Sequence, residues 1–154
     1  MGVVHRLHDV AYGSGRFVAV GNEGALVTSV GGISWTARQS GTDELRGIAY
    51  ARGTFVVAGH AGTILTSRNG LHWTKRNSGS DQRLYSVVYG RSRFVAVGWG
   101  GVVLNSETGI RWRRSASGIC ARLNTVSYTN GGFVASASDG AVLVSADGVT
   151  WNPR

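Results

Sequence analysis

One motif recurs four times along this chain, and it constrains the fold more than any other feature. A tryptophan recurs at spacings of 38, 39 and 39 residues, and one tyrosine and one phenylalanine recur at the same spacings. The recurring residues are Trp35, Trp73, Trp112 and Trp151; Tyr12, Tyr50, Tyr89 and Tyr128; and Phe17, Phe55, Phe94 and Phe133. From each phenylalanine to the next tryptophan the copies align without a gap. A fixed period of this length indicates stacked copies of one supersecondary unit.

Short alternating apolar runs separated by glycine-containing turns fill each unit, a pattern typical of strands linked by hairpins. In the second unit the strands are predicted over residues 45–50, 54–59, 63–67 and 71–75. Four short antiparallel strands per repeat of about 39 residues predict one blade of a β-propeller. We therefore predict an all-β protein of four four-stranded blades, at about 3–39, 40–77, 78–116 and 117–154.

The innermost strand of each unit is predicted to have two unequal faces. In the second unit, strict alternation places Leu45, Gly47 and Ala49 on one face and the large Ile48 and Tyr50 on the other. We expect the smaller face of one blade to receive the larger face of the next.

The stretch "SADGVTW", residues 145–151, closes the last unit, after "SVGGISW", "SRNGLHW" and "SETGIRW". It resembles the Asp-box, or bacterial neuraminidase repeat, and the whole unit is similar to repeats of photosystem II assembly factor-like propellers. The resemblance covers essentially the full chain and implies a propeller, a fold that serves many functions. This box is one residue shorter than usual, and Asp147 alone keeps the acid. We therefore interpret the box as turn chemistry in which Asp or Asn bonds backbone N–H groups.

Composition limits the biochemical class. The chain has 154 residues, enough for one domain with a real core, and a formal net charge of +8. The single Cys120 has no intrachain partner and fits no zinc-site spacing, and no cofactor or metal is expected. The N-terminal residues do not predict a signal peptide, and no apolar run approaches a membrane span. A soluble protein of undetermined compartment is expected.

Four blades left as an open arc would expose two apolar faces. The sequence favours closure by head-to-tail dimerisation into an eight-bladed ring, because blades of this length are slender for the wide wedges of a four-bladed ring. A closed four-bladed monomer and an excerpt of a larger propeller remain alternatives.

Candidate ligand-binding residues lie where the copies disagree, in the turns between second and third strands and in the connections between blades. They are Trp99, His60, Asn22, Glu23, Asp139, Arg6, Arg83 and Arg122. Trp99 in "GWGG" suits either an exposed anchor for a sugar or protein partner, or partial burial against a loop. The repeated Trp35, Trp73, Trp112 and Trp151 are interpreted as core residues, with inter-blade sugar pockets as the alternative.

The remaining arginines and lysines are interpreted as protection of exposed edge strands, and nucleic acid is not an expected partner. No nucleophile, phosphate-loop or metal motif supports an enzyme, and only Asp9 and Asp139 are candidates for paired carboxylates. The sequence therefore favours a non-catalytic propeller that serves as a binding or assembly platform, self-associates, and takes a protein or glycan ligand. The alternatives are a carbohydrate-binding propeller lectin and an amplified or engineered repeat scaffold with no ligand.

Overall fold

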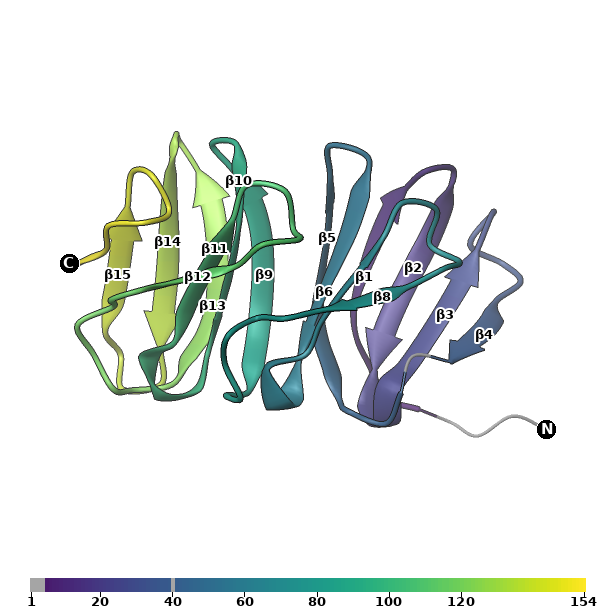
Figure 1. Ribbon diagram of the computed structural model, residues 1–154, viewed down its shortest axis with the longest axis horizontal. Helices are drawn as coiled ribbons and strands as arrows, with labels where there is room; N and C mark the ends of the chain where they lie inside the picture. Colours follow the sequence, from purple (N-terminus) through teal and green to yellow (C-terminus); the bar gives the residue numbers. More distant parts are fainter. Residues whose placement is uncertain (1–4, 40) are drawn as a thin grey trace.

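A computed structural model describes residues 5–39 and 41–154 and contains four separate four-stranded antiparallel sheets, in which strand order follows chain order (Figure 1). The predicted β-propeller fold class is confirmed. Blade 1 comprises β1 (Leu7–Gly13), β2 (Arg16–Gly21), β3 (Ala25–Ser29) and β4 (Thr36–Gln39). Blade 2 comprises β5 (Leu45–Ala51), β6 (Thr54–Gly59), β7 (Ile64–Ser67) and β8 (Thr74–Arg76). Blade 3 comprises β9 (Leu84–Gly90), β10 (Arg93–Gly98), β11 (Val103–Ser106) and β12 (Arg113–Ser115). Blade 4 comprises β13 (Leu123–Thr129), β14 (Gly132–Ala137), β15 (Val142–Ser145) and β16 (Asn152–Pro153).

In blades 1 to 3, the connection between the second and third strands contains one 3-10 turn: η1 (Asn22–Gly24), η2 (His60–Gly62) and η3 (Trp99–Gly101). The described helices are only these short turns, and none is long and apolar enough to cross a membrane.

The outermost strand of blade 2 begins later than predicted. Residues 71–73 belong to the preceding turn, and β8 starts at Thr74. The turn is held by bonds that recur in the other blades: the N–H of Gly70 donates to Oγ of Ser67 at 2.8 Å, and Nε1 of Trp73 donates to the carbonyl of Gly70 at 3.2 Å. Asn69 adds to it, since its Oδ1 accepts hydrogen bonds of 2.8 and 3.0 Å from the N–H groups of Leu71 and His72. These bonds hold the backbone in the turn instead of the ladder.

A β-bulge interrupts every innermost strand, so the predicted alternation of its faces is wrong at one residue. In blade 2, Leu45 pairs with Gly59 and Gly47 pairs with Ala58, which leaves Arg46 as the extra residue. Leu45 consequently packs on the same side as Ile48 and Tyr50, towards blade 1, and not with Ala49. A bulge shifts the side-chain period by one, which strict alternation cannot anticipate.

Three apolar cores lie between the blades, one at each boundary. The core between blades 1 and 2 joins Val18, Val20 and Leu26 to Phe55, Val57 and Leu65. Equivalent cores join blade 2 to blade 3 and blade 3 to blade 4. The larger residues of each blade therefore pack back on the smaller residues of its predecessor, in the direction that the sequence predicts.

The four blades form an open array with blade 1 and blade 4 at opposite ends (Figure 1). The closed four-bladed monomer considered from the sequence is therefore not the arrangement of this chain. Blade 1 has no predecessor, and Val10, Tyr12 and Trp35 are 54%, 57% and 42% exposed. Their counterparts are covered: Ile48 is 5% exposed and Trp151 is 7% exposed. Trp73 and Trp112 also pack against inter-blade cores, so the core interpretation fits three of the four tryptophans and not Trp35.

Candidate functional site

The four β-bulges place four different side chains at equivalent positions of the innermost strands. The bulged residues are His8, Arg46, Tyr85 and Asn124. The residue before each bulge is always leucine, whereas the bulged residue is never repeated. Bulges often lie next to functional sites because they redirect one side chain without disturbing the rest of the strand.

The two sets of segments predicted to carry ligand-binding residues lie side by side. Backbone carbonyls of the inter-blade connections, and of the residue just before β1, accept hydrogen bonds from the turns between second and third strands. The bonds join Arg6 to Asn22 (2.9 Å), Glu44 to His60 (2.8 Å), Arg83 to Trp99 (2.8 Å) and Arg122 to Ser138 (2.8 Å). Connections, turns and bulges lie at the same end of each blade and so form one long edge of the array, which we call the rim.

Glu44 is the centre of an ionic network at the rim. Its Oε1 lies 2.8 Å from Nη1 of Arg46 and 3.1 Å from Nε2 of His8, and its Oε2 lies 3.7 Å from Nδ1 of His60. The hydrogen bond from Arg46 lowers the pKa of Glu44 below its ordinary value, and the nearby histidines act in the same direction. The carboxylate is therefore ionised at neutral pH, where it accepts a hydrogen bond from Arg46 and lies close to histidines of two blades.

His60 lies between this network and blade 3. Its ring meets the ring of Tyr85 edge to face, with centroids 5.9 Å apart. Burial lowers the pKa of His60, because the charged imidazolium loses hydration there. Its Nε2 is buried without a hydrogen-bond partner among the residues that the structure describes. A neutral imidazole with one unused nitrogen is the consequence.

Tyr85 is flanked by two guanidinium groups. The Cζ atoms of Arg46 and Arg122 lie 5.4 and 5.6 Å from the centroid of its ring, within the range of cation–π contact. Arg122 is further oriented by a 2.7 Å hydrogen bond from Nε to Oδ1 of Asn124. In the described part of the chain, Arg122 has no carboxylate partner. We call His8, Glu44, Arg46, His60, Tyr85 and Arg122 the rim cluster.

Of the predicted site residues, His60 and Arg122 belong to this cluster, and Asn22 adjoins it through an Oδ1 that lies 2.6 Å from Nε2 of His8. The charge of Arg83 reaches His60 and lowers its pKa, after the larger effect of burial. The others lie apart from the cluster. Glu23 pairs with His5 at 3.6 Å, Asp139 accepts the N–H of Ala141 at 2.9 Å, and Arg6 contributes the carbonyl described above. Trp99 is 48% exposed.

His8, Arg46 and Tyr85 were missed because they lie within predicted strands. The signal that could have found them is a variable residue inside a repeated frame: "LHDV", "LRGI", "LYSV" and "LNTV". The two carboxylates singled out from the sequence, Asp9 and Asp139, lie in blades 1 and 4 and are not brought together. Within residues 5–39 and 41–154, no group of three or more His, Cys, Asp and Glu residues could hold a metal ion.

Comparison with known proteins supports the architecture. At the level of sequence, the chain matches no known protein family and no curated protein. The structure of YCF48 bound to D1 peptide is similar over 97% of this chain, with a TM-score of 0.77 and 14% identity. The computationally designed Ika4 protein matches over 94% of the chain (TM-score 0.77, 13% identity), and the designed Ika8 protein over 97% (TM-score 0.75, 13% identity). This chain covers 92% of Ika4 but only 53% of YCF48 and 49% of Ika8, so it spans about half the length of the latter two.

Proposed function

We propose that this protein is a non-catalytic binding platform that holds a segment of another protein at the rim cluster. The observation that carries the proposal is the set of four unlike bulged residues at one position of four strands that share a leucine before the bulge and a tyrosine near the strand end. A repeated frame needs only core residues to fold, so variable half-buried polar residues at one end favour a binding role. The similar YCF48 structure has a peptide bound, which is a precedent for a peptide ligand on this fold.

The chemistry of the rim cluster favours an acidic peptide. Arg122 offers guanidinium N–H groups that no carboxylate of the described chain neutralises, and Arg83 adds a further positive charge nearby. Arginine binds carboxylates through two parallel hydrogen bonds, and Tyr85 provides an aromatic anchor of the kind enriched at interface hot spots. The hydrogen bond to Glu44 keeps Arg46 in place.

A peptide array tests this proposal, followed by titration of the best acidic peptide by calorimetry. Tyr85→Ala and Arg122→Ala are expected to weaken binding by about tenfold or more, the loss typical of a hot spot. Arg91→Ala, at an exposed turn away from the rim, is the matched control and should bind as the unmodified protein does. Equal affinity of all three variants, with folding verified by circular dichroism, would reject the rim as the binding site.

Carbohydrate binding is the second candidate, favoured by the exposed ring of Trp99. Aromatic rings present an apolar face to sugars. A glycan array with Trp99→Ala as the control discriminates this function from peptide binding, and an absence of binding on both arrays would favour a scaffold without a ligand. The shortened Asp-box fits any of these functions, and we propose that it is a turn motif.

Self-association is part of the proposal. Val10, Tyr12 and Trp35 are exposed at the free face of blade 1, although their counterparts are covered. A second copy could place blade 4 against this face and complete eight blades in a head-to-tail ring. Blade 4 carries Ser127 and Ser136 where blade 2 carries Ala49 and Ala58. Contact between blade 4 of one copy and blade 1 of the other would bury the hydroxyl groups of Ser127 and Ser136. We therefore expect a dimer that dissociates on dilution.

Light scattering after size-exclusion chromatography measures this directly. A mass of twice 16.2 kDa at high concentration is expected, with Tyr12→Lys shifting the population to monomer. Tyr12 is exposed in the single chain, so its substitution should leave the monomer folded. A mass of 16.2 kDa at every concentration would reject self-association without affecting peptide binding at the rim.

A further inference from the structure

Two open grooves lie between neighbouring blades, at the turns that link third and fourth strands. Groove A, between blades 2 and 3, has a volume of about 620 Å³, and its lining includes Arg52, Arg68 and Arg76. Groove B, between blades 3 and 4, has a volume of about 550 Å³, and its lining includes Arg93, Arg111, Arg113 and Arg114. Both volumes are in the range of ligand sites. Glu107 and Thr108 line both grooves, which therefore adjoin each other at the turn between β11 and β12.

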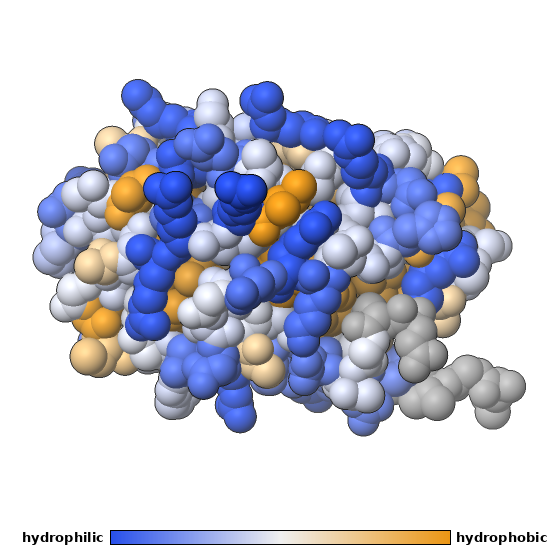
Figure 2. All heavy atoms as spheres, viewed as in Figure 1, coloured by the Kyte–Doolittle hydropathy of each residue, from blue (hydrophilic) through white to orange (hydrophobic). Residues whose placement is uncertain are grey.

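The charge of the grooves is almost entirely uncompensated. Seven arginines line them, and among the described lining residues Glu107 is the only carboxylate. Glu107 is 75% exposed and lies 3.5 Å from Nη2 of Arg93. Figure 2 shows the resulting spread of hydrophilic side chains over the face on which β8 and β12 lie. Protection of edge strands accounts for arginines on outermost strands but not for Arg52, Arg68 or Arg93.

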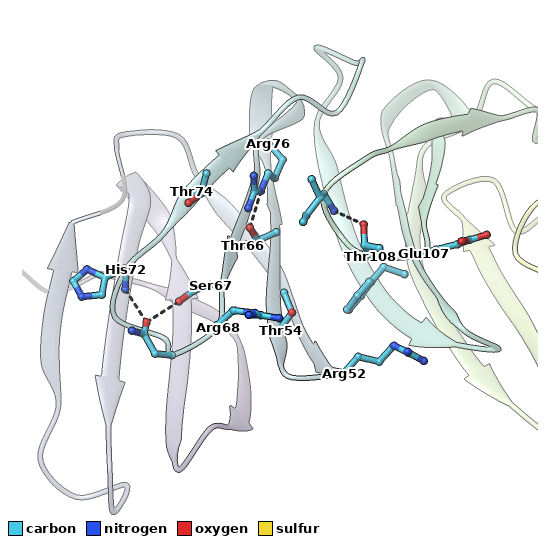
Figure 3. Close-up of a pocket in the computed structure, with 13 residues that line it drawn as sticks. Arg52, Thr54, Thr66, Ser67, Arg68, His72, Thr74, Arg76, Glu107 and Thr108 are labelled. Atoms are coloured by element: carbon cyan, nitrogen blue, oxygen red, sulfur yellow. Dashed lines mark hydrogen bonds between the residues drawn. The ribbon is translucent and has the colours of Figure 1, made fainter.

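Hydrogen bonds to the blade hold one arginine in each groove. In groove A, Nε of Arg76 donates to Oγ1 of Thr66 at 2.9 Å, as Figure 3 shows. In groove B, Nη1 of Arg93 donates to Oδ1 of Asn105 at 2.6 Å, and Nδ2 of Asn105 donates to Oγ of Ser115 at 2.8 Å. Asn105 is 4% exposed, so this support is built into the sheet. Guanidinium groups held in place lose less freedom when an anion binds.

The lining distinguishes between classes of anion. Single-stranded nucleic acid needs exposed aromatic rings on which bases stack. No exposed tryptophan, tyrosine or phenylalanine is among the described lining residues, since Phe94 is 1% exposed. Hydroxyl groups take their place, including those of Thr54, Thr74 and Thr108. Guanidinium groups and hydroxyls together suit a ligand that carries both anionic groups and many hydroxyls.

We propose that grooves A and B together bind a sulfated oligosaccharide, with the arginines on its sulfate groups and the threonines on its hydroxyls. Because the two grooves adjoin at Glu107 and Thr108, a ligand that occupies both must be a chain of several sugars rather than a single one. This site lies at the end of the blades opposite to the rim, and it does not depend on the peptide function or on self-association.

Calorimetry with a heparin-derived octasaccharide tests the proposal, alongside the same octasaccharide without sulfate and a 12-residue oligo-dT. Two double variants remove groove charge at exposed side chains: Arg52→Gln with Arg68→Gln, and Arg111→Gln with Arg113→Gln. The control, Lys75→Gln with Arg91→Gln, removes equal charge from exposed residues outside the lining of both grooves.

Each groove variant is expected to bind the octasaccharide at least about fivefold more weakly, with a shallower dependence of log affinity on log salt. The control should lose less than twofold, and removal of sulfate should abolish binding. Equal losses in groove and control variants would overturn the proposal, because net charge alone would then be responsible. Tighter binding of oligo-dT would overturn it in favour of nucleic acid, and binding without sulfate would overturn the role of the arginines.

Discussion

Oδ2 of Asp9 accepts a 3.0 Å hydrogen bond from the backbone N–H of Ile48, across the boundary between blades 1 and 2. The same position of blade 3 is Ser86, whose Oγ accepts the N–H of Val126 at 3.2 Å. Asp9, considered from the sequence as a carboxylate for chemistry, therefore has a structural partner in the next blade.

Replacing Asp9 with alanine should destabilise the fold by about 1–2 kcal/mol, because the amide of Ile48 loses its acceptor. Urea denaturation measures the effect. Thr125→Ala is the matched control, since it occupies the same position on the free face of blade 4 and should change stability by less than about 0.5 kcal/mol. An equal effect at both positions would contradict the inter-blade role of Asp9.

Alanine substitutions at Gly62 and Gly53 should separate two causes of lost stability, an unfavourable backbone conformation and a steric clash. Both have positive φ, of 68° and 73°. A Cβ at Gly62 would overlap the carbonyl oxygen of Ser80, whereas a Cβ at Gly53 would meet nothing. Gly53→Ala should cost about 1–2 kcal/mol from φ alone, and Gly62→Ala at least about 2 kcal/mol more. Thermal and urea unfolding of the two variants check this difference, and similar values would show that the connection at Ser80 moves freely.

Asp147 should stabilise its turn more than Thr108 stabilises the equivalent turn. Oδ1 of Asp147 accepts the N–H groups of Val149 and Thr150, each at 2.8 Å, and Thr108 accepts only the N–H of Ile110, at 3.2 Å. Asp147→Ala is expected to cost about 1 kcal/mol and Thr108→Ala a few tenths, as measured by urea denaturation. Asp147→Asn should be nearly neutral, because Asn69 makes the same bonds in blade 2.

The carboxylate of Asp147 should also make the free energy of unfolding depend on pH in the acid range. The N–H groups of Thr150 and Val149 lower the pKa of Asp147, so the unfolded chain binds its proton more readily than the folded chain does. The stabilisation is present above the unfolded pKa of about 4 and is lost as pH falls through the lower folded value. Asp147→Asn should reduce the loss of unfolding free energy at low pH, as measured by urea denaturation at several pH values. An unchanged loss in this variant would contradict the prediction.

His60 predicts a second pH effect, nearer neutrality. Burial lowers the pKa of His60, so its contribution is full above the unfolded pKa of about 6.5 and declines as pH falls below it. Unfolding free energies measured between about pH 7.5 and 5.5 should therefore depend less on pH in His60→Gln. His72→Gln, at an exposed histidine, is the control and should retain the full slope.

The fold could be predicted because a propeller blade is made of local contacts. Recurring Phe, Tyr and Trp gave the period, and glycine-containing turns separated the strands of each unit. The bulge at Arg46 could not be predicted, since the insertion of one backbone residue has no compositional signature. The exposure of Trp35 was missed for another reason: its repeat resembles the others, and only its place at the end of the array removes its cover.

Two members of the rim cluster were among the candidates named from the sequence. Comparing copies identified His60 and Arg122, because turns and connections are where repeats diverge. Glu44 was not among the candidates, and its contacts with His8 and Arg46 depend on the distance between bulges of adjacent blades. Such distances follow from how blades pack, which residue patterns do not encode.

The bulges also bear on how such a protein can change over evolutionary time. A bulged residue takes no part in the ladder pairing, and His8, Arg46, Tyr85 and Asn124 are each only half-buried. Mutations at these four positions should leave the apolar cores unaffected, so the chemistry of the rim can change with little penalty in folding. Duplication of a unit would supply another such position at once. A repeat of this kind combines a repeated scaffold with a few positions that are free to vary.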